Sequence, residues 1–137
     1  YELAPMSDDL TRFLAPPKTL FTAAEFPMED ERGVTDGAFF HRSPKSGKLF
    51  MIWSTHNPAR PKGADYCVIL CESASGKVAG PWVKHRLFFD RNGGHGMFFR
   101  KTDGTLMLCL HCPEKWGDER PLFLSVEDDG ETLLIRE

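Results

Sequence analysis

An internal repeat constrains the fold of this 137-residue chain more than any other feature. Residues 34–42 return in degenerate form at 94–100, and aligning the letters places Asp36 on His95 at an offset of 59. A charged turn with a glycine and an apolar run follow each copy. The further matching runs are 48–53 with 105–110, at an offset of 57, and 67–72 with 122–127, at an offset of 55. Three elements that repeat in one order indicate a duplicated unit.

Each copy of the repeat predicts four short strands, because apolar runs of strand length alternate with turn-forming residues. The predicted strands are 36–42, 48–54, 65–73 and 82–89 in the first copy, and 95–100, 105–111, 121–127 and 132–136 in the second. The second strand of each copy is apolar on both faces, which indicates that both faces of its sheet are covered. A four-stranded unit that stacks on copies of itself is typical of a propeller blade.

The predicted fold is therefore all-β: a β-propeller fragment with about two four-stranded antiparallel blades plus the end of a preceding blade. A sandwich of two four-stranded sheets is the rival fold. The predicted division is 1–33 for the end of the preceding blade and a connector, 34–92 for one blade, and 93–137 for the last blade. Two blades do not close a ring, so remaining blades or self-association are expected to cover the open flanks.

The part before the first full blade is the least regular. Residues 6–13 predict a turn or short helix, 18–21 a short strand, and 23–30 a connector. The chain begins at Tyr1 with no initiator methionine and no signal-peptide pattern, which predicts that it belongs to a longer polypeptide. Its compartment is not readable from this start.

Composition and charge narrow the class of partner. The net charge of −3 gives no reason to expect a nucleic acid, and no run of 18 apolar residues predicts a membrane span. Four cysteines are too few for a disulfide scaffold. Cys109 and Cys112 have the CxxC spacing of a zinc site, so a zinc-stabilised β domain is one alternative, and buried free thiols are the other.

Propeller topology predicts where the polar residues gather. The first strand of a blade is innermost, so Asp36 and His95 are expected to be neighbours at the central channel. The loops 54–64 and 112–120 are expected to form the rim above them. The candidate ligand-contacting residues on or near that rim are Trp53, His56, His111, Trp116 and Arg120. An acid, imidazoles, aromatic rings and a guanidinium around one funnel suit a neutral polar ligand such as a sugar.

The chain at this point resembles the five-bladed propeller glycoside hydrolases of family 43, which have arabinofuranosidase and β-xylosidase activities. The residues that carry the resemblance are Val34-Thr35-Asp36-Gly37-Ala38, Ser75-Gly76 through Gly80-Pro81-Trp82, and Gly93-Gly94-His95-Gly96. The similarity covers essentially the whole chain. It implies a carbohydrate substrate, an oligosaccharide or polysaccharide, and a secreted or periplasmic location is what a plant-glycan hydrolase favours.

The resemblance implies inverting hydrolysis, in which one carboxylic acid protonates the glycosidic oxygen while another carboxylate activates water. The general acid of the family, a Glu, matches Asp36, and its channel histidine matches His95. That histidine holds a calcium or sodium ion largely through water, and no other cofactor is required. Asp36 is one methylene shorter than Glu, and Ala38 stands where the family has proline. The general base belongs to earlier blades, so this portion alone is expected to be inactive.

Simpler alternatives stay open for each residue. Asp36 could be the first residue of an Asp-Gly turn, and His95 could hydrogen-bond the channel lining. Trp53 could belong to the core, and Arg120 could pair with its acidic neighbours. The runner-up function is a non-catalytic propeller that binds carbohydrate or supports a partner domain.

Overall fold

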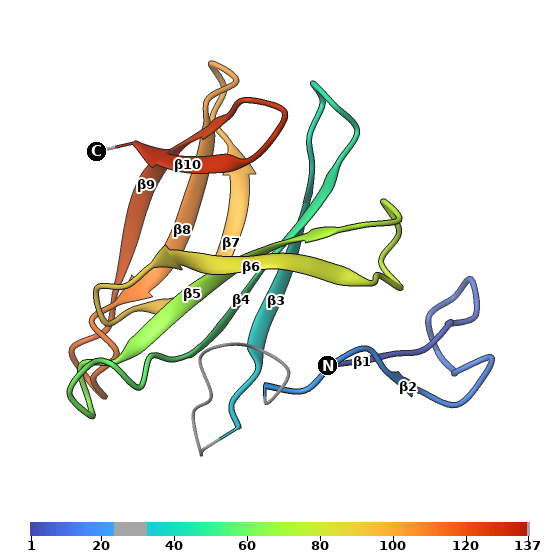
Figure 1. The fold of residues 1–137 in the computed structure, drawn as a ribbon, viewed down its shortest axis with the longest axis horizontal. Coiled ribbons are helices and arrows are strands. Elements are labelled where there is room, and N and C mark those ends of the chain that lie inside the picture. Colours follow the sequence, from blue (N-terminus) through green and yellow to red (C-terminus); the bar gives the residue numbers. More distant parts are fainter. Residues whose placement is uncertain (24–32, 137) are drawn as a thin grey trace.

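The computed structural model describes residues 1–23 and 33–136, and these form an all-β structure of ten strands (Figure 1). The strands are β1 Glu2–Leu3, β2 Lys18–Thr19, β3 Asp36–Arg42, β4 Leu49–His56, β5 Tyr66–Ser73, β6 Trp82–Phe89, β7 Gly94–Arg100, β8 Leu106–Cys112, β9 Arg120–Asp128 and β10 Leu133–Arg136. The eight strands predicted from the repeat are thus confirmed, each end within two residues of its expected place. Among the described residues, no helix is long and apolar enough to cross a membrane.

The eight long strands make two antiparallel meanders, here called the first sheet (β3-β4-β5-β6) and the second sheet (β7-β8-β9-β10). Tight turns make this order possible. The turn between β3 and β4 closes when the Ser43 N–H donates to the Lys48 carbonyl, and Gly47 within it has φ +76°. The turn between β7 and β8 is one residue shorter and closes from Lys101 to Thr105. The two copies of the repeat therefore each form one sheet.

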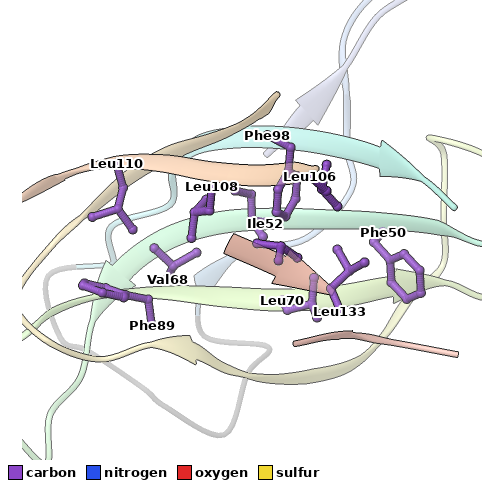
Figure 2. Close-up of a cluster of buried hydrophobic side chains, with 11 residues drawn as sticks. Phe50, Ile52, Val68, Leu70, Phe89, Phe98, Leu106, Leu108, Leu110 and Leu133 are labelled. Carbon is purple, nitrogen blue, oxygen red and sulfur yellow. The ribbon is translucent and has the colours of Figure 1, made fainter. Parts of the chain in front are cut away.

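The main hydrophobic core lies between the two sheets, as Figure 2 shows. Its buried side chains alternate along the strands, because alternate residues of a strand point to the same face. The first sheet contributes Phe50, Ile52, Val68, Leu70 and Phe89, and the second contributes Phe98, Leu106, Leu108, Leu110, Val126 and Leu133. Burial of this apolar surface holds one sheet against the other.

A second core covers the opposite face of the first sheet. Its buried members are Phe21, Met51, Trp53, Cys67, Ile69 and Cys71. The ring of Trp53 makes edge and tilted contacts with Tyr1 and Phe21, at centroid distances of 6.2 and 5.6 Å. The first sheet is thus covered on both faces, as the two-sided apolar pattern of β4 predicts.

The segment before the first sheet differs in part from prediction. The short strand expected at 18–21 is the two-residue β2, which pairs with β1, a strand that was not predicted. Residues 6–13 form a turn closed by a bridge between Met6 and Phe13, so the short-helix alternative is wrong. The connector predicted at 23–30 lies, apart from Ala23, outside the described residues.

One buried polar cluster also joins the sheets. Asp128, at the end of β9, is 2.9 Å from His41 Nε2 and accepts a hydrogen bond of 2.9 Å from the Ser43 hydroxyl. The Gly130 N–H donates to the same carboxylate at 2.9 Å. A buried carboxylate needs such partners, and here one comes from β3 and one from the turn that follows it.

Candidate active site

The first strands of the two sheets begin with the same irregular backbone. In the first sheet the ladder pairs Asp36 with Ser54 and then Phe39 with Ile52. In the second sheet it pairs Gly94 with His111 and then Met97 with Cys109, so both ladders skip two residues of the inner strand. The equivalent residue of Asp36 is therefore Gly94.

This register corrects the letter alignment of the repeat by one residue. Gly37 and His95 are equivalent, at an offset of 58, and both have left-handed backbone, with φ +57° and +53°. The offset predicted for the third strands is wrong as well: the ladders make Leu70 equivalent to Phe123, an offset of 53. Matching Gly96 to Gly37 by residue type had hidden the backbone equivalence.

Asp36 and His95 are neighbours, as the topology predicts. His95 Nδ1 lies 3.2 Å from Asp36 Oδ2, and both side chains are about half exposed. The contact needs a gap at Gly37, because a Cβ there would lie 2.9 Å from the His95 ring. The His95 N–H donates to Ser54 Oγ at 2.8 Å. A non-glycine residue with positive φ is held in place by such surroundings, and these residues gather at functional sites.

A third residue, Tyr66 at the start of β5, completes the cluster and was missed from the sequence. Its hydroxyl donates to Asp36 Oδ2 at 3.0 Å. Its ring stacks on His111 with a centroid distance of 5.6 Å and an interplanar angle of 16°. The ring of His56 contacts Tyr66 from another direction at 5.1 Å. The sequence offered one signal for Tyr66. It is the second residue of the predicted strand 65–73, which follows the predicted rim loop 54–64.

The two histidines predicted on the rim therefore lie beside the site, each next to a carboxylate. His111 Nε2 contacts Glu114, and His56 Nδ1 is 3.4 Å from Asp65. Glu114 was also missed from the sequence. Because His111 and His56 both touch Tyr66, they are connected to Asp36 through its ring and hydroxyl.

The other three predicted ligand-contacting residues make no contact with Asp36 in the described structure. Trp53 is fully buried in the second core, so its ring offers no face to a sugar. Arg120 is exposed on the rim, and its Nη1 donates to the carbonyls of Gly117 and Glu119 rather than to Asp36. Trp116, in the same loop, is 97% exposed.

The described residues offer a metal ion one imidazole and no cluster of ligands. With Nδ1 of His95 directed at Asp36, Nε2 is the nitrogen left for an ion or its water. No group of three or more His, Cys, Asp or Glu side chains in residues 1–23 and 33–136 could hold a metal.

The cysteines do not form the set of ligands that the zinc alternative needs. Cys67 and Cys71 are buried in the second core, and the Cys112 thiol donates to the Arg91 carbonyl at 3.2 Å. Cys109 lies on β8 between the core residues Leu108 and Leu110, and its side chain is on the opposite, outer face of the second sheet. Across the described part of the chain, all four are free thiols.

Comparisons with known proteins show the fold. No family model and no curated protein sequence matches the chain. Among solved structures, an endo-arabinase from Bacteroides thetaiotaomicron is 33% identical, with a TM-score of 0.80 over 94% of this chain and 47% of that one.

Two further structures agree. An endo-1,4-beta-xylanase from the same organism is 22% identical, with a TM-score of 0.75 over 98% of this chain and 48% of that one. A Cellvibrio cellulosa alpha-L-arabinanase complexed with arabinohexaose is 19% identical, with a TM-score of 0.63 over 96% of this chain and 48% of that one. The chain spans about half the length of each. It is therefore an all-β fragment with the fold of β-propeller glycosidases, comprising two four-stranded blades.

Proposed function

We propose that this chain supplies the acid side of the active site of an inverting glycoside hydrolase, of the family 43 type, that acts on arabinose- or xylose-containing plant polysaccharides. The observation that carries the proposal is Asp36: an exposed carboxylate at the start of an innermost strand, held at Oδ2 by Tyr66 and His95. The arabinanase and xylanase activities of the similar structures support the substrate class.

In the proposed reaction, Asp36 as a carboxylic acid protonates the glycosidic oxygen of the leaving group. A carboxylate on the other side of the sugar activates the attacking water. By the resemblance, that base and the third, tuning carboxylate belong to other blades. We therefore propose that the 137 residues alone do not turn over substrate. Because Asp36 is one methylene shorter than Glu, its backbone would lie closer to the glycosidic oxygen.

The surrounding residues have supporting roles in this proposal. His111 and Arg120 would contact sugar hydroxyls from the rim, and His56 would buttress the ring of Tyr66. An ion near His95, held mainly by water, would fix the imidazole without entering the reaction. No substrate contact is proposed for Trp53, because it lies in the core.

The test is hydrolysis of methoxyphenyl α-L-arabinofuranoside and methoxyphenyl β-D-xyloside, whose poor leaving group needs a proton, by the full protein that contains these residues. Asp36→Asn is expected to lower kcat by a factor of 100 or more, within the range that general acid catalysis contributes. The matched control is Asp118→Asn, which removes an exposed rim carboxylate paired with Lys115, and it is expected to stay near full activity. Unchanged activity in Asp36→Asn would move the acid elsewhere.

A non-catalytic carbohydrate-binding propeller is the second candidate. It is favoured by two differences from the family pattern: Asp36 stands where the family has Glu, and Ala38 where it has Pro. It predicts that the full protein hydrolyses neither glycoside and still binds arabino- or xylo-oligosaccharides. Calorimetry with arabinohexaose, on the same preparation, separates this result from a protein that neither binds nor cleaves.

A further inference from the structure

Both hydrogen-bond partners of Asp36 lie on one of its two carboxylate oxygens. The Tyr66 hydroxyl and His95 Nδ1 are 3.0 and 3.2 Å from Oδ2. No hydrogen bond from the described residues reaches Oδ1. The two oxygens of the carboxyl group are therefore not equivalent, and Oδ1 is the one without a hydrogen-bond donor from the described residues.

The Tyr66 hydroxyl is held more firmly than a surface phenol. The side chain is buried, with its ring stacked on His111 and in contact with His56. Gly94 leaves the space for it, since a Cβ at that position would lie 2.3 Å from Tyr66 Cε1. The ring is thus fixed by its packing before any substrate binds, which is the condition for a positioning group.

The hydroxyl of Tyr66 also stays a donor across the working pH range. Burial, and next the charge of Asp36, raise the pKa of Tyr66 well above its ordinary value. It keeps its proton and does not compete with Asp36 as the acid.

From this geometry we propose that Tyr66 is a positioning residue, which holds Oδ2 of Asp36 so that Oδ1 carries the transferred proton. The inference rests on the proposed function. The Oδ1 proton passes to the glycosidic oxygen while the glycosidic C–O bond breaks and its electron pair stays on that oxygen. Asp36 is left as a carboxylate, stabilised at Oδ2 by the Tyr66 hydroxyl. Water attacks the anomeric carbon from the other side and gives its proton to the base.

The test compares leaving groups, because proton donation matters most when the leaving group is a poor one. In the full protein, kcat/KM is measured for aryl glycosides from dinitrophenyl to methoxyphenyl. Tyr66→Phe keeps the ring contacts and removes only the hydroxyl. It is expected to lose about tenfold on the methoxyphenyl glycoside, the worth of one hydrogen bond to a charged group, and less than about threefold on the dinitrophenyl glycoside.

The control is Asp118→Asn, which removes the exposed rim carboxylate that pairs with Lys115. It is expected to leave the dependence on the leaving group unchanged. Thermal unfolding of both variants is expected to stay close to that of the parent, which excludes a general loss of structure as the cause.

The outcomes separate the two proposals. If Asp36→Asn depends strongly on the leaving group and Tyr66→Phe loses the same factor with every glycoside, or nothing, the role of Tyr66 is overturned and the proposed function stands. If Asp36→Asn shows no such dependence, Asp36 is not the acid and both proposals fail. A parent that cleaves no glycoside overturns both as well.

Discussion

The two sheets present equivalent rows of apolar side chains, and only one row is covered. Phe39, Ile52 and Leu70 of the first sheet correspond by ladder register to Met97, Cys109 and Phe123 of the second. Ile52 and Leu70 are 0% and 2% exposed against the second sheet, whereas Met97 and Phe123 are 47% and 55% exposed. Both rows are apolar, so their difference in burial comes from the sheet that packs on the first row and not from the residue types.

The comparison teaches what the outer face of the second sheet requires. An exposed apolar patch of this kind marks an interaction surface. In the first sheet the equivalent row packs on another four-stranded sheet. We therefore propose that a further blade covers the row Met97, Cys109 and Phe123, as the second sheet covers the equivalent row of the first. The following predictions test how far the two rows differ.

The largest difference is expected from truncation of one residue in each row. Leu70→Ala is expected to lower the free energy of unfolding by about 3 kcal/mol, because it leaves a cavity in a closed core. Phe123→Ala in the 137-residue chain is expected to cost less than about 1 kcal/mol, since its side chain is half exposed. Urea unfolding measures both. If the two variants lost the same unfolding free energy, the two rows would be equally buried, and the contrast would be wrong.

The polar link between the sheets gives a second contrast, because Phe99 stands where the first sheet has His41. Asp128→Asn is expected to cost about 2 kcal/mol at neutral pH, the scale for hydrogen bonds to a charged group. Burial raises the pKa of Asp128, but the hydrogen bonds from His41, Ser43 and the Gly130 N–H outweigh it, so the net shift is downward.

The direction of that shift fixes the pH dependence. A lowered pKa stabilises the fold above the ordinary Asp value of about 3.9, and this contribution is lost as pH falls through the native pKa. The difference in unfolding free energy between the parent and Asp128→Asn should therefore shrink below about pH 4. A difference that stays constant down to pH 2 would show that the charge of Asp128 contributes nothing.

The equivalent position with left-handed backbone gives a third contrast. It is Gly37 in the first sheet and His95 in the second. His95→Gly is expected to raise the free energy of unfolding by about 1 kcal/mol, because it relieves the φ of +53°. It should at the same time lower the activity of the full protein. Gly37→Ala is the reciprocal change and should destabilise. Thermal unfolding of both variants checks the pair; a loss of stability in His95→Gly would show that its contacts outweigh the strain.

The smallest effect on stability is expected from charges on the open row. Met97→Lys should change the unfolding free energy by less than about 0.5 kcal/mol in the 137-residue chain. If the chain self-associates through this face, the same change should weaken its association, which sedimentation measures at several concentrations. Thr102→Lys, in the exposed turn between β7 and β8, is a control for added charge outside this row.

The sheets could be predicted almost in full from the sequence, because strand length, turn residues and the repeat all point to the same eight strands. The register could not. Residue letters align Gly37 with Gly96, while the backbone aligns it with His95, and the φ of a histidine is not visible in its letter. The offset error of one residue still left Asp36 and His95 close enough to be found as neighbours.

The site was predicted in part. Position in a blade places Asp36, His95, His56 and His111 near one another, since topology fixes which strand ends share a face. The direction of a side chain depends on which side of a strand it leaves. Trp53 leaves β4 toward the second core, and so it is buried rather than on the rim. Tyr66 of β5 reaches Asp36 of β3 across β4, a contact that no spacing in the sequence encodes.

The strand order has a consequence for how the chain folds. Every ladder in the two sheets joins strands that are consecutive in the sequence, so each sheet closes short loops and can form early. The docking of sheet on sheet links residues as distant as His41 and Asp128, 87 positions apart, and is expected to come later. On a ribosome the first sheet would therefore wait with Ile52 and Leu70 exposed until β7 to β10 emerge.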